Sequence, residues 1–144
     1  MSSQASEQTP YALLGGETGV AALCDRFYGL MDSQAQFSLL RSLHPENLKG
    51  SRDKLFMFLS GWFGGPDLFV QQYGHPRLRQ RHLPFSIGIA ERDQWVACML
   101  QAMTEEDIEP GLRERLLQNF FKTADFMRNR EEAGAAGPAS QLIL

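Results

Sequence analysis

The chain has 144 residues, of which 43% are hydrophobic and 22% charged, and its formal net charge at pH 7 is −3. This length and composition fit one soluble globular domain and exclude a disordered chain, while the acidic balance argues against a nucleic-acid-binding protein. The longest apolar run, residues 55–59, is far short of the roughly 20 residues that cross a bilayer, so we expect no membrane association.

The N-terminal half predicts helices after a polar leader. Residues 1–10 read as a flexible extension without the apolar core of a secretory signal, which favours a cytoplasmic location. An apolar stretch from Tyr11 ends at a Gly15-Gly16 turn. Thr18 is then expected to cap a helix. The apolar face of this helix comprises Val20, Cys24, Phe27, Tyr28 and Met31. A second apolar stretch, residues 37–43, stops before His44-Pro45.

The C-terminal half continues the helical pattern. Ser51 opens a helix that Gly64-Gly65-Pro66 ends, and residues 76–82 form a short helix that Pro84 ends. Further helices are predicted over residues 90–104 and from Pro110 onward. Residues 131–144 lack any such pattern and are predicted to be a disordered tail. Because no segment alternates with period two, we predict an all-α fold with one domain over residues 11–130.

The two cysteines, Cys24 and Cys98, sit in apolar helical patterns and lack the spacing of a metal-binding pair. We interpret both as buried thiols, with a disulfide or a metal-binding role as the less favoured alternative.

The histidines are too few and too scattered for a multi-histidine metal centre. A haem needs only one strong axial ligand and an apolar pocket, and short helices rich in aromatic residues suggest packing around a flat group. His82 fits this need at the end of a short helix. Phe85 and Ile87 could then pack against the ring, and the side chains that could pair with propionates are Lys54, Arg79 and Arg81. The alternative is a helix-end histidine that binds free carbonyl groups.

Other candidates have ordinary explanations as well. Tyr28 could be a core tyrosine with a satisfied hydroxyl group, and Trp95 could be plain core packing. His75 and His44 each precede a proline, which favours an extended backbone and, for His75, a surface or capping role.

Together these residues resemble a known family. The segment GHPRLRQRHLPFSIGIAERDQW, residues 74–95, resembles the signature of group II (O-type) truncated haemoglobins of the bacterial type. The similarity continues in YALLGGETGV, CDRFYGLM and HPENLKGSRDKLFMFLSGWFGGP and covers roughly residues 11–128. It implies a two-over-two helical sandwich around haem b (iron protoporphyrin IX).

The resemblance also implies roles for individual residues. His82 would be the proximal iron ligand, and Tyr28 and Trp95 would be distal hydrogen-bond donors. Ser51 would stand in place of a distal histidine. His44 would be a further distal residue and could supply a third hydrogen bond, but it falls where the family often has tyrosine or phenylalanine, so the details of the distal hydrogen bonds are left open. The remaining haem contacts would be Lys54, Leu55, Phe58, Trp62, Tyr73, Arg79, Arg81, Phe85 and Ile87.

Three functions remain open at this point. The first is a haemoglobin that binds O₂, NO, CO or peroxide at a five-coordinate iron for binding, sensing or defence against reactive species rather than bulk oxygen transport. The second is a haem enzyme with NO dioxygenase or peroxidase-like activity. Such an enzyme would require an unidentified reductase, because the chain has no flavin or NAD fingerprint. The third is a non-haem helical interaction protein. We expect a monomer or weak dimer.

Overall fold

The computed structural model describes residues 8–129, and within this range every regular element is helical and no strand occurs. The predicted all-α fold is confirmed, while the predicted C-terminal tail lies outside the described residues. None of the described helices is both long enough and apolar enough to cross a membrane. In chain order the elements are α1 (Pro10–Leu13), α2 (Gly16–Ser33), the 3₁₀ turn η2 (Ala35–Phe37), α3 (Ser38–Ser42), α4 (Lys49–Trp62), α5 (Leu68–Tyr73), α6 (Leu78–His82), α7 (Ile89–Glu105) and α8 (Pro110–Phe126).

Several helix boundaries differ from the sequence expectations. Helix α2 begins at Gly16, directly after Gly15 with a φ of 101°, so Thr18 lies inside its first turn and does not cap it. The side chain of Thr9 instead caps α1, whose first residue is Pro10, within the predicted N-terminal extension. Helix α4 begins before Ser51. Helix α5 was not predicted, because six residues between two turns carry too little periodicity.

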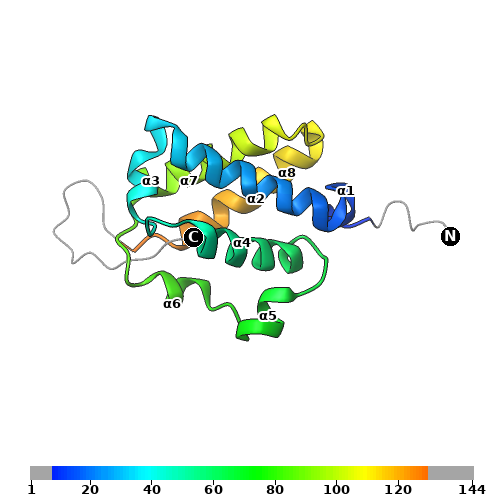
Figure 1. Ribbon diagram of the computed structural model, residues 1–144, viewed down its shortest axis with the longest axis horizontal. Coiled ribbons are helices and arrows are strands. Elements are labelled where there is room, and N and C mark those ends of the chain that lie inside the picture. Colours follow the sequence, from blue (N-terminus) through cyan, green and yellow to red (C-terminus); the bar gives the residue numbers. More distant parts are fainter. Residues whose placement is uncertain (1–7, 130–144) are drawn as a thin grey trace.

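The main core lies between two helix pairs. Helix α2 packs against α4 and α7, and α7 packs against α8. Figure 1 shows α2 crossing in front of α7 and α8, with α4 directly below it. The side chains at the centre of this core are completely or almost completely buried, among them Val20, Leu23, Phe27, Met31, Leu59, Phe63, Met99, Met103 and Phe120. The regular apolar faces of these four long helices therefore account for the body of the molecule.

Both cysteines lie in this core. Cys24 and Cys98 are free and buried, which confirms the interpretation as buried thiols. Burial raises the pKa of each thiol to about 12, because the surrounding apolar side chains disfavour the thiolate. Neither thiol is therefore suited to metal binding or nucleophilic chemistry at neutral pH.

The short helices α5 and α6 lie on the far side of α4 from α2 (Figure 1). Helix α5 packs against α4, whereas α6 makes no extensive backbone contact with any other helix. Apolar support near α6 comes from a separate small cluster, which contains Ile87 and Met127 with Leu43, Leu78 and Phe85 packed against them. Between α6 and α4 lies a space that is lined by side chains of both helices.

Candidate functional site

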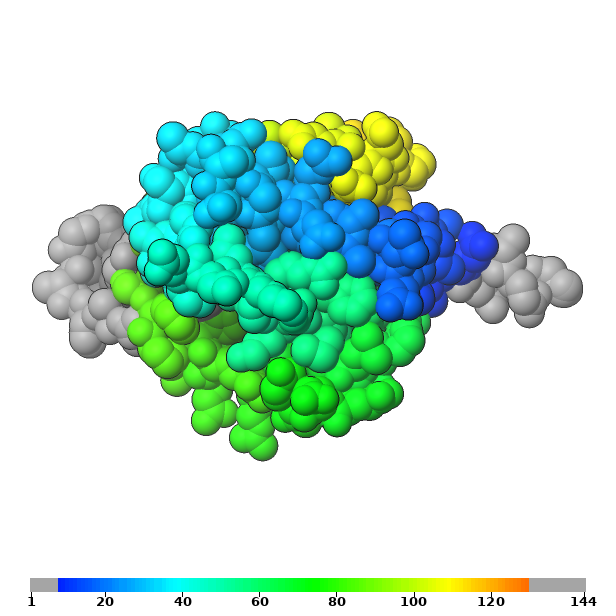
Figure 2. All heavy atoms as spheres, viewed as in Figure 1, coloured from blue at the N-terminus to red at the C-terminus, as the bar shows by residue number. Residues whose placement is uncertain are grey.

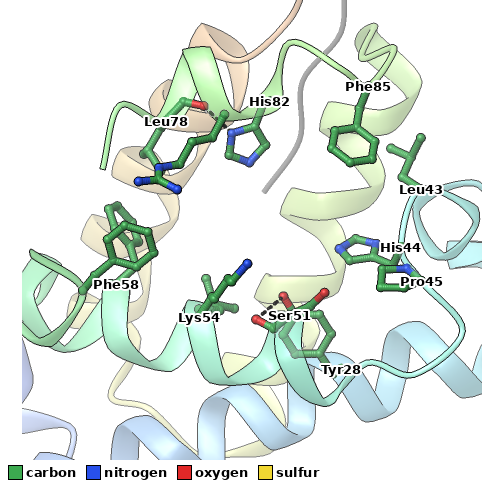
Figure 3. Close-up of a pocket in the computed structure, with 13 residues that line it drawn as sticks. Tyr28, Leu43, His44, Pro45, Ser51, Lys54, Phe58, Leu78, His82 and Phe85 are labelled. Atoms are coloured by element: carbon green, nitrogen blue, oxygen red, sulfur yellow. Dashed lines mark hydrogen bonds between the residues drawn. The ribbon is translucent and has the colours of Figure 1, made fainter. Parts of the chain in front are cut away.

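A cavity of about 350 Å³ lies between α4 and α6. Its volume falls within the range of roughly 300–1,000 Å³ that is usual for small-molecule and cofactor sites. Figure 2 shows the surface hollowed between the α3–α4 segment and the yellow-green α6 segment, and Figure 3 shows the side chains that surround the space. The lining residues are Tyr28, Leu43, His44, Pro45, Ser51, Lys54, Leu55, Phe58, Phe69, Leu78, Arg81, His82 and Phe85.

His82 occupies the α6 side of the cavity. It is the last residue of α6, and its side chain is 7% exposed. Its Nδ1 contacts the carbonyl oxygen of Leu78, one turn earlier, so this nitrogen carries the proton and donates it. The lone pair is then on Nε2, and Figure 3 shows the ring projecting into the cavity. Burial lowers the pKa of His82 to about 2, with a smaller contribution from His44, so the imidazole is neutral.

Tyr28 lies across the cavity from His82, on α2. Its hydroxyl group donates a hydrogen bond of 3.3 Å to the backbone carbonyl of Ser51, near the start of α4. The side chain is 5% exposed, and burial raises its pKa well above the usual value, which keeps the phenol protonated. The site thus places a neutral imidazole opposite a neutral hydroxyl group (Figure 3).

His44 lies beside Tyr28, in the turn that follows α3. Their ring centroids are 5.9 Å apart in an edge-to-face arrangement. The Nδ1 of His44 lies 3.0 Å from the carbonyl oxygen of Leu40 and therefore carries the proton in the neutral ring. In this tautomer Nε2 is an acceptor, so His44 differs from Tyr28 in its hydrogen-bonding character.

Two cations stand at the edge of the cavity. Lys54 Nζ lies 5.7 Å from the centroid of the Tyr73 ring, and the Arg81 guanidinium lies 5.1 Å from that of Phe69. Arg81 also donates to the carbonyl oxygen of Pro76. Tyr73 does not line the cavity, but it lies against Lys54 and so helps to place this positive charge at the edge. These cations suit a ligand with anionic groups at its rim.

Four other residues expected at the site lie outside the cavity lining. Trp62 stacks on Phe120 with the ring centroids 4.7 Å apart, one layer behind Phe58. Ile87 belongs to the small cluster with Met127. Tyr73 contacts Lys54, as described above, and packs against Phe69 of the lining with the ring centroids 4.9 Å apart. Arg79 donates to the carbonyl oxygens of Phe126 and Arg128 at 2.8 and 2.9 Å, on the side of α6 away from the cavity.

Trp95 is the fifth expected residue outside the lining. It lines a much smaller space of about 20 Å³ together with Leu43, which also lines the main cavity. The side chain is 3% exposed, and its Nε1 has no hydrogen-bond partner among residues 8–129. A buried N–H group without a partner costs about 1–3 kcal/mol, so a polar ligand within its reach would be stabilised.

The sequence analysis did not select four residues of the lining: Leu43, Pro45, Phe69 and Leu78. Leu78 could have been found, because it precedes His82 by one helical turn and therefore lies on the same face of α6. Phe69 belongs to α5, which was itself not predicted. Leu43 and Pro45 flank His44, and the turn after α3 brings both of them to the cavity.

These residues fit a haem group. The lining is mostly apolar, the neutral imidazole of His82 offers a lone pair from the α6 side, and two cations stand at the rim where propionates would lie. No group of three or more His, Cys, Asp or Glu side chains within residues 8–129 could hold a bare metal ion. A single axial ligand in an apolar pocket is what an iron porphyrin requires of a protein.

Comparisons with known proteins agree with this assessment. The pattern of the bacterial-like globin family matches residues 9–129. The chain is 38% identical over 128 residues to the group 2 truncated hemoglobin YjbI of Bacillus subtilis, which covers 89% of this chain and 94% of that protein.

Solved structures show the same similarity. The group II 2-on-2 hemoglobin of Agrobacterium tumefaciens superposes with a TM-score of 0.84 at 42% identity and covers 91% of this chain and all of that chain. The truncated oxygen-avid haemoglobin of Bacillus subtilis superposes with a TM-score of 0.78 at 37% identity and covers 85% of this chain and all of that chain. The predicted two-over-two fold is confirmed by these neighbours.

Proposed function

The chain belongs to the bacterial-like globin family, with group 2 truncated haemoglobins as homologues, and on this premise we propose that it is an oxygen-binding haem protein. Haem b would be held between α4 and α6, with Nε2 of His82 as the residue that would bind its iron. Haem iron supplies the position at which a diatomic ligand such as O₂, NO or CO binds.

The observation that carries this proposal is the state of His82. Its Nδ1 proton is fixed on the carbonyl oxygen of Leu78, and burial holds the ring neutral, so a lone pair on Nε2 faces the cavity at neutral pH. A hydrogen bond at the other ring nitrogen orients a metal-binding imidazole and increases its basicity. A helix-end histidine that only satisfied free carbonyl groups would not need to project into an apolar cavity.

The remaining residues of the site would bind and orient the haem and its ligand. Leu55, Phe58, Leu78 and Phe85 provide apolar surfaces that exclude water. Lys54 and Arg81 orient the ring by pairing with propionates. On the side opposite His82, the hydroxyl group of Tyr28 can rotate away from Ser51 and donate to a bound ligand. The indole N–H of Trp95, just outside the cavity lining, has no partner among residues 8–129 and is a second donor for a ligand within its reach. His44, with its Nδ1 proton on Leu40, has Nε2 available as a hydrogen-bond acceptor in this network.

Two donors on the ligand side favour tight binding of O₂ and slow release. Each hydrogen bond contributes about 1 kcal/mol, and more where water is excluded. One of the related structures carries the description oxygen-avid, which supports the same direction. Slow release suits oxygen binding, sensing or defence against reactive oxygen and nitrogen species rather than bulk transport.

The experiment is to measure O₂ dissociation by stopped flow for the haem-loaded protein and for Tyr28→Phe, with Tyr11→Phe as the matched control on α1, away from the cavity. We expect Tyr28→Phe to release O₂ about five to ten times faster, for the loss of one hydrogen bond worth about 1–1.4 kcal/mol. Tyr11→Phe should match the wild type. Rates of reaction with NO and H₂O₂ measured on the same samples separate gas binding from the enzymatic alternative.

A further inference from the structure

The segment that carries His82, residues 74–88, lacks the support that the long helices have. Helix α6 contains only five residues, and isolated helices shorter than about 12 residues are marginal in water. It starts after Arg77, which is held in the left-handed region with a φ of 47° and offers no side-chain cap. No extensive backbone contact joins α6 to another helix. Something other than helix packing must therefore fix the position of His82.

Arg79 provides one connection, from α6 to the end of α8. Its Nη1 donates to the carbonyl oxygens of Phe126 and Arg128, at 2.8 and 2.9 Å, and its guanidinium lies 5.6 Å from the centroid of the Phe126 ring. The last carbonyl groups of a helix have no partner within the helix, and a cation there is favourable. Arg79 thus links the helix of His82 to a long helix of the main core.

Asn129, which follows α8, provides the second connection, to the loop after His82. Its backbone N–H donates to the carbonyl oxygen of Ile87 at 3.0 Å, and its Oδ1 accepts from the N–H of Ile87 at 3.1 Å. Its Nδ2 donates to the carbonyl oxygen of Phe85 at 3.1 Å. Together with the two bonds of Arg79, these bonds form a clamp on both sides of His82, which we call the α8 clamp.

We propose that Arg79 and Asn129 are positioning residues that tie the His82 segment to the end of α8 and thereby set how firmly His82 holds haem. This inference rests on the proposed function. The buried side chains of Ile87 and Met127 belong to one apolar cluster and add an apolar contact between the same two segments. The clamp bonds to backbone groups of Phe85, Ile87, Phe126 and Arg128, of which only Phe85 also lines the cavity with its side chain.

In this proposal Arg79 positions α6 and does not act by pairing with a propionate. Variants of Asn129 distinguish these two roles of Arg79. Asn129 bonds to Phe85 and Ile87 and does not line the cavity. If Arg79 acted only on a propionate, a change at Asn129 would leave the iron–histidine bond unaltered. If both act as a clamp, changes at either residue loosen His82 in the same way.

The test uses the haem-loaded full chain and two measurements: the rate of haem transfer to excess apomyoglobin, and the iron–histidine stretching band of the ferrous protein in resonance Raman spectra. We expect Arg79→Gln and Asn129→Ala each to speed haem transfer about three- to tenfold, since each removes hydrogen bonds that are partly exposed to solvent. The stretching band should shift or broaden in both. Arg79→Lys keeps a cation within reach of the two carbonyl groups and should restore most of the wild-type behaviour.

Arg77→Gln is the matched control, because it removes the same charge from the same exposed segment and should match the wild type. Asn129→Asp keeps an acceptor for Ile87 but places an anionic oxygen against the carbonyl oxygen of Phe85 in place of the donor, so it should show an effect of the same sign even if Asn129→Ala folds poorly. A wild-type transfer rate and an unshifted band in both Asn129 variants would overturn the clamp while leaving the proposed function intact. A wild-type protein that did not hold haem through His82 would overturn both.

Discussion

The cavity has two walls, and they are held in place by different means. The wall formed by α2 and α4 belongs to the main core, where Phe27 and Leu59 are buried and the helices are 18 and 14 residues long. The wall formed by residues 74–88 consists of a five-residue helix and a loop, supported by a small apolar cluster and by hydrogen bonds to the end of α8. Packing therefore fixes the side that carries Tyr28, whereas a few polar contacts fix the side that carries His82.

This difference matters for a protein that must insert its cofactor. A wall that is weakly supported until the cavity is filled can admit a large flat group and then close upon it, because low local stability permits opening. Under the proposed function the opposite wall must stay in place, since Tyr28 would face the ligand in a fixed geometry. The following predictions probe that division, beginning with the largest effect.

Truncating a core side chain of the first wall should cost far more than truncating one of the second. Phe27→Ala removes a fully buried ring that packs 5.0 Å from the ring of Tyr28 and 5.2 Å from that of Trp95. We expect it to lower the free energy of unfolding by about 3–5 kcal/mol. Phe85→Ala, at a half-buried position, should cost about 1–2 kcal/mol. Urea unfolding of the haem-loaded variants measures both, and equal costs would show that residues 74–88 belong to the main core.

The second prediction concerns ligand release and two residues outside the His82 wall, Trp95 on α7 and His44 after α3. Trp95→Phe keeps an aromatic ring in the core and removes the Nε1–H that lacks a partner within the described residues. Loss of a hydrogen bond of about 1–1.4 kcal/mol implies O₂ release that is roughly five to ten times faster. His44→Phe removes an acceptor instead and should change the O₂ release rate less than about twofold. A larger effect at His44 than at Trp95 would mean that His44 donates to the ligand through its other tautomer.

The smallest effect is expected at the end of α8, which supports the second wall. Asp125 accepts hydrogen bonds from Arg92 at 2.9 Å and from Arg128 at 2.7 Å, and these hydrogen bonds lower the pKa of its carboxyl group. A lowered pKa in the folded state stabilises the protein above the unfolded value of 3.8, and this contribution is lost as the pH falls below it. Because the side chain is 39% exposed, Asp125→Asn should cost only about 0.5 kcal/mol at pH 7. The difference from the wild type should shrink as the pH falls below 3.8 and through the lowered pKa; a difference that did not shrink would point to lost packing.

The same division explains what could be predicted from the sequence. The faces of α2 and α7 repeat with helical spacing, so Cys24, Phe27, Tyr28 and Trp95 could be placed on buried faces from the pattern alone. The His82 motif could be recognised, but its surroundings could not. The contacts of Arg79 and Asn129 join residues almost 50 positions apart through backbone carbonyl groups, which leave no trace in side-chain periodicity.

The tautomers of His44 and His82 could not be predicted from the sequence either. That Nδ1 of both His44 and His82 carries a proton follows only from the carbonyl oxygens of Leu40 and Leu78 beside them. Both carbonyl groups precede their histidine by four residues, yet the sequence does not show whether either ring turns toward its own helix. This geometry makes His82 a ligand with a fixed lone pair and His44 an acceptor.

The central claim is that His82 is the bond between this chain and its haem. The most direct measurement is the absorption spectrum and haem content of the purified wild type and of His82→Gly, with and without added imidazole. We expect the wild type to carry haem in a 1:1 ratio, His82→Gly to lose most of it, and imidazole to restore the ferrous spectrum by occupying the space of the missing side chain. A His82→Gly protein that kept its full haem content and an unchanged ferrous spectrum without imidazole would contradict the account.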